Sequence, residues 1–302
     1  MGCYFFYGLG KAYYVLGDYV KAIECSQRSL EIARKIEDIK SEGLALSNLG
    51  IAYNSLGEYA KAIEYNQQSL VISRKIGDLK EEVVALNNLG MTYYSLGYYN
   101  QALEYYQQSL AIAIKIQHRW GEGTALVNLG SVYQSLEDYE IALNYYEQSL
   151  SIAQEIGDRA GMGRVLVNLG NIYSTRIRGD QRENLEQAIN YYQQSLAITE
   201  EIGNLCGKAS GLANFGITLI GLEQYSEALE YLQAALEIFR GIGARADEAE
   251  ALKILVELYQ KLGCPHLALE YCNQALSIAT ELGIPIAKEC QELKEQLLSE
   301  QT

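Results

Sequence analysis

Apolar side chains recur along the chain at the spacing of amphipathic helices. Between residues 46 and 56, Leu46, Leu49, Tyr53 and Leu56 stand at i, i+3, i+7 and i+10, which is one face of a helix. Gly57 is predicted to end this helix, because glycine tolerates the positive φ of a left-handed stop. A second helix is predicted over residues 59–76, and its buried side holds Tyr59, Ala62, Ile63, Leu70 and Ile76.

This pair of helices is repeated along the chain. Each of the seven copies has a reference position, which is Val256 in the last copy and glycine in the other six: Gly10, Gly50, Gly90, Gly130, Gly170 and Gly216. Successive copies are 40 residues apart, except that 46 residues separate the fifth from the sixth. Other columns keep this register: an alanine follows in Ala22, Ala62, Ala102, Ala142, Ala188, Ala228 and Ala268. Three residues after the reference position stands tyrosine in six copies, and Leu219 is the exception.

The pattern resembles the tetratricopeptide repeat (TPR) family over essentially the whole chain. The family motif W-x2-L-G-x2-Y…A-x3-F…P maps onto Leu46, Leu49, Gly50, Tyr53 and Ala62. Leucine replaces the tryptophan, Asn66 stands at the aromatic position, and the proline is missing. Without the proline the second helix can run on, which explains the 40-residue period. Repeats of this length are similar to those of kinesin light chains, spindle adaptors and bacterial signalling proteins.

The resemblance implies an all-α fold: a right-handed α-solenoid of seven antiparallel helix pairs. We assign residues 1–283 to the repeats and 284–302 to a C-terminal capping helix and tail. Ile286, Cys290, Leu293 and Leu297 share one face of that final helix, as a cap requires. The fifth copy has a six-residue insertion within about 176–184, interpreted as a longer solvent loop.

The N-terminal end shows no comparable cap. Phe5 and Phe6 fall at its exposed side. We therefore expect this end to meet another domain or a second copy, or the chain to be a fragment.

A column of asparagines is the main candidate site. It stands two residues before the reference glycine, at Asn48, Asn88, Asn128, Asn168 and Asn214. In TPR superhelices the first helix of each pair lines the concave face, so the resemblance places this column in the groove. Each amide could pair with the backbone of an extended peptide, or could bond sideways and tie neighbouring helices together. Both interpretations remain open, and peptide binding is the working hypothesis.

The neighbouring columns describe the expected ligand. Leu44 and Val84 precede the glycine by six residues, Ile51 and Met91 follow it by one, and Arg164 stands nearly alone as a cation. The groove is thus largely neutral and partly apolar. Glutamates lie near the starts of three first helices, at Glu42, Glu82 and Glu122, and favour a neutral to basic protein or peptide partner over an acidic one.

Composition excludes several other classes. The 302 residues carry 24 Lys and Arg against 38 Asp and Glu, a net charge of −14, which disfavours nucleic-acid and membrane-surface binding. No apolar stretch approaches 18 residues and the N-terminus lacks a signal-peptide pattern. The six cysteines are scattered, as is usual in a reducing compartment, so we expect a cytoplasmic protein.

Catalytic and metal-binding motifs are not found in the sequence. The two histidines, His118 and His266, belong to no catalytic motif, and His118 is interpreted as a solvated turn residue. Cys264, His266 and Cys272 fit no zinc spacing and are interpreted as packing residues. We expect no enzyme activity, no metal and no cofactor. The sequence favours a peptide-binding scaffold; the alternative is a sensor or regulatory module of a larger signalling protein or enzyme, such as a protease-linked TPR array.

Overall fold

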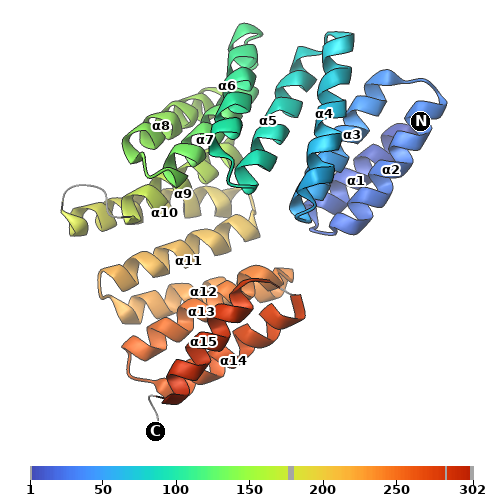
Figure 1. Cartoon of the computed structure of the whole chain (residues 1–302). Coiled ribbons are helices and arrows are strands. Elements are labelled where there is room, and N and C mark those ends of the chain that lie inside the picture. Colours follow the sequence, from blue (N-terminus) through green and yellow to red (C-terminus); the bar gives the residue numbers. More distant parts are fainter. Residues whose placement is uncertain (1, 176–179, 283, 300–302) are drawn as a thin grey trace. The chain divides into compact units, whose positions relative to one another are not determined.

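The computed structural model describes residues 2–175, 180–282 and 284–299, and this part of the chain contains fifteen helices and no strand (Figure 1). The chain divides into two compact units, Met1–Ile156 and Gly157–Thr302, called here the N-terminal and C-terminal units. The N-terminal unit holds α1 (Gly2–Val15), α2 (Tyr19–Lys35), α3 (Ile39–Ser55), α4 (Tyr59–Ile76), α5 (Leu79–Ser95), α6 (Tyr99–Lys115), α7 (Arg119–Ser135) and α8 (Tyr139–Ile156). The C-terminal unit holds α9 (Arg159–Ser174), α10 (Gln181–Glu201), α11 (Leu205–Gly221), α12 (Tyr225–Ile242), α13 (Arg245–Lys261), α14 (Pro265–Leu282) and α15 (Ile286–Ser299).

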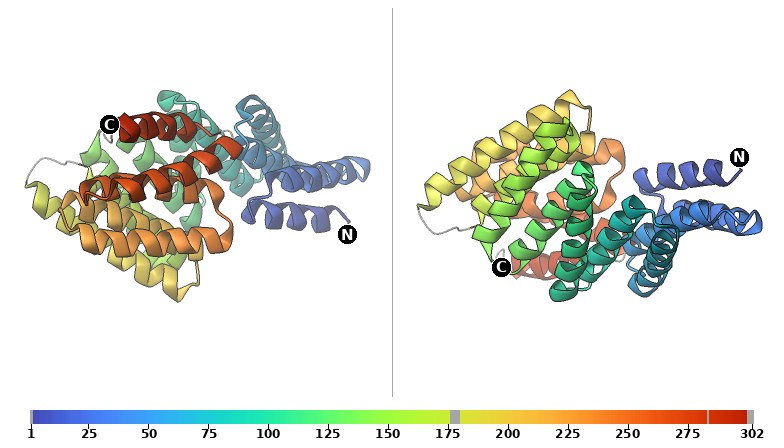
Figure 2. Two further views of the ribbon diagram at one scale, coloured as in Figure 1. Left: turned by 90° about the horizontal axis from the view of Figure 1, so that it is seen from below. Right: turned by 90° about the horizontal axis from the view of Figure 1, so that it is seen from above.

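Within each unit the helices form a row of hairpins, which Figure 2 shows from two further directions. The first helix of each hairpin packs on its own second helix and also contacts the first helix of the next hairpin, as α3 does with α5 and α11 with α13. Among the described residues, the second helices of successive hairpins make no such contact. Each unit therefore curves with its first helices on the inner side, as the TPR resemblance implies.

The reference glycines allow the two helices of a hairpin to approach closely. A Cβ atom on Gly90 or Gly170 would lie 2.5 Å from a ring carbon of Tyr106 or Tyr192, and both rings are buried. The same slot holds Asn66 in the second copy, against Gly50. Because the glycine faces a large side chain from the second helix, the glycine column is required by packing.

A serine column that the sequence analysis did not interpret ties each hairpin together. In five copies its hydroxyl donates to a backbone carbonyl of the first helix, with oxygen–oxygen distances between 2.9 and 3.1 Å. The donors are Ser29, Ser69, Ser109, Ser149 and Ser195, and the acceptors are Cys3, Gly43, Val83, Gly123 and Gly163. These bonds satisfy buried hydroxyls that would otherwise destabilise the fold.

The first helices are capped at their N-termini by a recurring side chain. Asp38, Asp78, Asp158 and Asn204 each accept a hydrogen bond from the backbone N–H three residues on. His118 takes this position before α7 but makes no capping bond. It is half-buried and its Nδ1 atom has no hydrogen-bond partner, so the interpretation of His118 as a solvated residue is wrong.

Two further expectations need correction. Ile76 is the last residue of α4 and is 40% exposed, because the hairpin turn carries it past the packed face. Residues 181–184, expected as part of a loop, form the first turn of α10. Residues 176–179 of the insertion lie outside the described residues.

The two ends of the chain differ in their surfaces. Ile286, Cys290 and Leu297 of α15 are buried in the core of the C-terminal unit, and Leu293 packs against that core. At the other end, Phe5 of α1 is 65% exposed, whereas Phe6 is half-buried.

Candidate functional site

The asparagine column lies on the first helices, and in three copies it lies where a first helix meets the preceding one. Asn48 and Asn128 are half-buried, and Asn88 is 8% exposed. Leu44 and Val84, one helical turn before the column, and Ile51 and Met91, about one turn after it, are also half-buried. Half-buried side chains at i, i+4 and i+7 form one stripe of a helix, so α3 and α5 each present an amide flanked by apolar groups.

In the N-terminal unit each asparagine bonds to the preceding hairpin. The Nδ2 atom of Asn88 donates to Ser47 Oγ at 3.0 Å, and that of Asn128 donates to Asn87 Oδ1 at 3.3 Å. Asn48 donates to the backbone oxygen of Tyr7 at 3.5 Å. The acceptor is always the residue 41 positions earlier. The sideways bond that the sequence analysis kept open is therefore present.

This bond leaves part of each amide unused. A carboxamide has two N–H donors and a carbonyl acceptor. The hydrogen bond to the preceding hairpin, called here the helix tie, occupies one of these donors. The Oδ1 atoms of Asn48, Asn88 and Asn128 accept no hydrogen bond from the described residues. The tie fixes the amide in one orientation and leaves its acceptor available.

The C-terminal unit presents the column differently. The side chains of Asn168 and Asn214 are half-buried and form no hydrogen bond with the described part of the chain. Arg164, one turn before Asn168, is exposed. Both amides of this unit thus keep all their hydrogen-bonding groups.

A second row of polar side chains joins first helices farther along. Ser55 Oγ donates to Tyr14 Oη at 3.3 Å, and Tyr94 Oη lies 2.9 Å from Ser135 Oγ. Each pair again spans 41 residues. This row lies two helical turns beyond the asparagine column and places neutral polar groups between successive first helices.

The glutamates at the helix starts are already paired. Glu42 lies 2.8 Å from Arg34 and Glu82 lies 2.7 Å from Arg74, each an arginine of the preceding second helix. Glu122 lies 2.8 Å from Arg119 of its own first turn. These carboxylates, which the sequence analysis took to favour basic ligands, are thus neutralised by intramolecular ion pairs.

An exposed tryptophan was not predicted. Trp120, at the second position of α7, is 49% exposed, and its ring centroid lies 6.1 Å from that of His118. Its register is that of Lys40 and Lys80, and this exchange of an aromatic for lysine was visible in the sequence. An exposed indole offers a large surface to a ligand at the edge of the inner face.

Burial raises the pKa of one nearby acid. Glu81, in the first turn of α5, has a raised pKa, chiefly because burial disfavours its charged form and secondarily because Asp78 repels it. Asp78 itself is paired with Lys40 at 2.9 Å.

Stacked helical hairpins with their first helices on the inner side define an α-solenoid of the repeat-protein class. The chain belongs to the tetratricopeptide repeat family, whose model matches residues 5–75, 41–115, 121–183 and 181–241. Residues 217–283 also match a model described as anaphase-promoting complex subunit 5. A comparison with curated proteins gives no match.

Solved structures share the fold at low sequence identity. A Rap protein complexed with competence and sporulation factor has 18% identity and a TM-score of 0.73, over 94% of this chain and 77% of that chain. The Rap conjugation gene regulator of the plasmid pLS20, in complex with the Phr* peptide, has 18% identity and a TM-score of 0.72, over 93% and 74%. The apo form of RapI has 16% identity and a TM-score of 0.68, over 94% and 99%.

The described residues form neither a membrane-spanning helix nor a cluster of metal-binding side chains. Among the described residues, no helix is both long and apolar enough to span a bilayer. The same part of the chain contains no group of three or more His, Cys, Asp or Glu side chains suited to a metal ion.

Proposed function

We propose that this protein is a non-enzymatic, cytoplasmic scaffold that binds an extended segment of a partner protein or peptide on the inner faces of its units. The observation that carries the proposal is the row of oriented amides in the N-terminal unit. Asn88 and Asn128 are held by neighbouring helices, and their carbonyl oxygens remain available for a ligand. A similar fold binds the Phr* peptide in the structure of the Rap conjugation gene regulator of plasmid pLS20, and this likeness supports peptide binding as the function.

The spacing of the amides suits an extended chain. Packed helices lie roughly 8–10 Å apart, and an extended chain advances about 3.3 Å per residue. One amide would then meet every third residue of the ligand. Each amide would accept a backbone N–H through Oδ1 and donate its second N–H to a backbone carbonyl.

The side chains around the amides define the preferred ligand. In the N-terminal unit Leu44, Val84, Ile51 and Met91 would receive apolar side chains. The sequence predicts a neutral to basic partner. Because Glu42, Glu82 and Glu122 are already paired with arginines, a neutral partner is better supported than a basic one. In the C-terminal unit Asn168 and Asn214 would take the same role beside Arg164.

The test separates ligand binding from the helix tie. Hexapeptides would be selected from a random library on the full chain, and their binding measured by fluorescence anisotropy. The variant Asn88→Ala with Asn128→Ala removes two amides of the N-terminal unit. The control, Ser47→Ala with Asn87→Ala, removes the acceptors of the same two hydrogen bonds and keeps both amides.

We expect the amide variant to weaken peptide binding by about 100-fold, since each amide forms two hydrogen bonds worth about 0.5–1.5 kcal/mol. The control should weaken it by no more than about tenfold. Equal losses in both variants, with equal losses of thermal stability, would show that the amides serve only as ties. The parallel variant Asn168→Ala with Asn214→Ala tests the C-terminal unit.

A second candidate function is that of a sensor or regulatory module in a larger assembly. The N-terminal hairpin favours it, because Phe5 of α1 is largely exposed and Leu16, which follows α1, is 77% exposed. In later first helices the register of Phe5 holds buried alanines such as Ala45 and Ala85. Light scattering of the full chain over a wide concentration range tests self-association through this hairpin, and a Phe5→Ser, Leu16→Ser variant is the control.

A further inference from the structure

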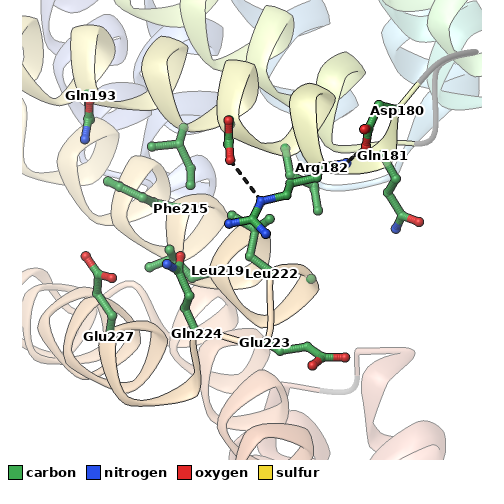
Figure 3. A pocket seen from close by; sticks show the side chains of 14 residues that line it. Asp180, Gln181, Arg182, Gln193, Phe215, Leu219, Leu222, Glu223, Gln224 and Glu227 are labelled. Carbon is green, nitrogen blue, oxygen red and sulfur yellow. Dashed lines mark hydrogen bonds and ion pairs between the residues drawn. The ribbon is translucent and has the colours of Figure 1, made fainter.

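The C-terminal unit contains a hollow of about 730 Å³ away from the asparagine column (Figure 3). One wall is a face of α10, and the other is the end of α11 with the start of α12. In Figure 3, Leu219 and Leu222 lie between Arg182 of α10 and the side chains of Glu223 and Gln224, and Phe215 lies beside them. The volume is within the range of ligand-binding pockets, about 300–1,000 Å³.

The insertion in the fifth copy builds the first wall. Leu185 has the register of Tyr59 and Tyr99, which are the first residues of α4 and α6. Helix α10 begins four residues earlier, at Gln181, and so carries an additional turn. Gln181, Leu185 and Ile189, four residues apart, lie on the face that lines the hollow.

Leu219, which replaces the tyrosine found at this position in the other six copies, leaves the hollow open. At two other interfaces the tyrosine of this column accepts a hydrogen bond from a glutamine of the preceding second helix. Gln27 Nε2 donates to Tyr53 Oη at 3.4 Å, and Gln233 Nε2 donates to Tyr259 Oη at 3.3 Å. At the hollow the corresponding residues are Gln193 and Leu219, and leucine has no hydroxyl to reach the glutamine.

The hollow combines an apolar floor with an acidic rim. Leu185, Phe215 and Leu219 of the floor are buried within the unit. On the rim, Arg182 is paired with Glu186 at 3.1 Å. Glu223 and Glu227 have no cationic partner among the described residues, so the rim keeps an excess of negative charge.

We propose that this hollow is a second binding site, for a short cationic amphipathic segment of a partner protein. Its apolar side chains would contact Leu185, Phe215 and Leu219, and its lysines or arginines would pair with Glu223 and Glu227. The face of α10 from Gln181 to Gln193 spans about 18 Å at 1.5 Å per residue. An extended segment of about five or six residues has that length. This site does not depend on the inner-face proposal.

The experiment uses the full chain and a fluorescein-labelled hexapeptide of alternating leucine and lysine. Two further hexapeptides replace every lysine by glutamate or every leucine by serine. Leu219→Tyr restores the side chain that six other copies carry and fills the hollow. Glu223→Lys with Glu227→Lys reverses the rim. Glu137→Lys with Glu140→Lys makes the same change of net charge in the N-terminal unit, and Glu137 has the turn position of Glu223.

Of the three hexapeptides, we expect only the alternating leucine and lysine peptide to bind saturably. Leu219→Tyr and the rim reversal should each weaken its affinity by at least about tenfold. The Glu137, Glu140 control and the Asn88, Asn128 amide variant should bind as the unmodified chain does. Absence of saturable binding, or equal weakening by the two charge variants, would overturn the proposal. So would binding that Leu219→Tyr leaves unchanged while circular dichroism shows intact helices. If Leu219→Tyr does not fold, the two charge variants decide, because they change exposed side chains only.

Discussion

Asn66 is a polar side chain in a slot that other copies fill with a ring. It is fully buried, and neither its Nδ2 nor its Oδ1 atom has a hydrogen-bond partner. The Oδ1 atom of Asn54, in the facing first helix, is likewise buried and unpaired. In the fourth copy the slot holds Tyr146, whose hydroxyl donates to Gln134 Oε1 at 2.9 Å. Gln134 has the register of Asn54, so we predict that Asn66→Tyr stabilises the protein.

The magnitude follows from the two unsatisfied groups. Each buried group without a partner costs about 1–3 kcal/mol, so relieving Asn66 and Asn54 is worth roughly 2–6 kcal/mol. Introducing a larger side chain into a packed slot costs about 1–3 kcal/mol. We expect a net gain of about 2 kcal/mol, which is a rise in Tm of about 4–8 °C for a unit of this size.

The matched variant Asn66→Leu separates the two contributions. Leucine stands in this slot in the sixth copy, as the buried Leu232, and it relieves Asn66 without reaching Asn54. Thermal unfolding followed by circular dichroism should rank Asn66→Tyr above Asn66→Leu and both above the unmodified chain. Equal gains would show that the new hydroxyl does not pair with Asn54. A loss of stability in Asn66→Leu would refute the reasoning, because removal of an unsatisfied amide should then have been favourable.

Three further predictions concern single positions, each read out by thermal unfolding. Gly90→Ala should lower the free energy of unfolding by more than about 1 kcal/mol, because the new Cβ would lie 2.5 Å from the Tyr106 ring. Gly8→Ala should raise it by up to about 1 kcal/mol, because Gly8 lies in open space within α1 and alanine favours a helix. Burial lowers the pKa of His118 below 6.5, so the unfolded chain takes up the proton first and stability falls as the pH drops below about 6.5. The variant His118→Asp should lose this dependence and gain about 1 kcal/mol from capping α7. Glu137→Gly should stabilise by about 1 kcal/mol, because Glu137 has a φ of 62°. Unchanged stability in any of these variants would contradict the structural reason given for it.

Most of the fold could be predicted from the sequence because the same pattern of small and apolar residues recurs in seven copies. The glycine column predicts that the two helices of each hairpin approach closely. In the structure, Gly90 packs directly against the Tyr106 ring of the second helix. The serine column was equally regular but stayed uninterpreted. Ser109 bonds to the carbonyl of Val83, 26 residues earlier, and that partner is known only once the hairpin is folded.

The contacts of the candidate site could not be predicted from the sequence. The family resemblance predicts an inner-face location for Asn88, whereas its bond to Ser47 depends on how two successive first helices pack. The ion pair between Glu82 and Arg74 joins successive hairpins and could not be predicted from helix starts alone. Two irregularities of the repeat, Leu219 and the insertion, are visible in the sequence. Only the structure shows that both contribute to the hollow.

The helix tie and peptide binding by the asparagine column are compatible, and the first strengthens the second. A free asparagine side chain that binds a peptide loses rotamer entropy, worth about 0.5–1.5 kcal/mol per immobilised side chain. In the N-terminal unit this loss has already occurred on folding, because Asn88 and Asn128 are held by Ser47 and Asn87. At the lower end of that range, about 1 kcal/mol for the two side chains together, the control variant that frees both amides should weaken binding by about fivefold. In the C-terminal unit, where Asn168 and Asn214 have no such tie, a ligand would bear that cost itself, so the N-terminal unit should be the tighter binder.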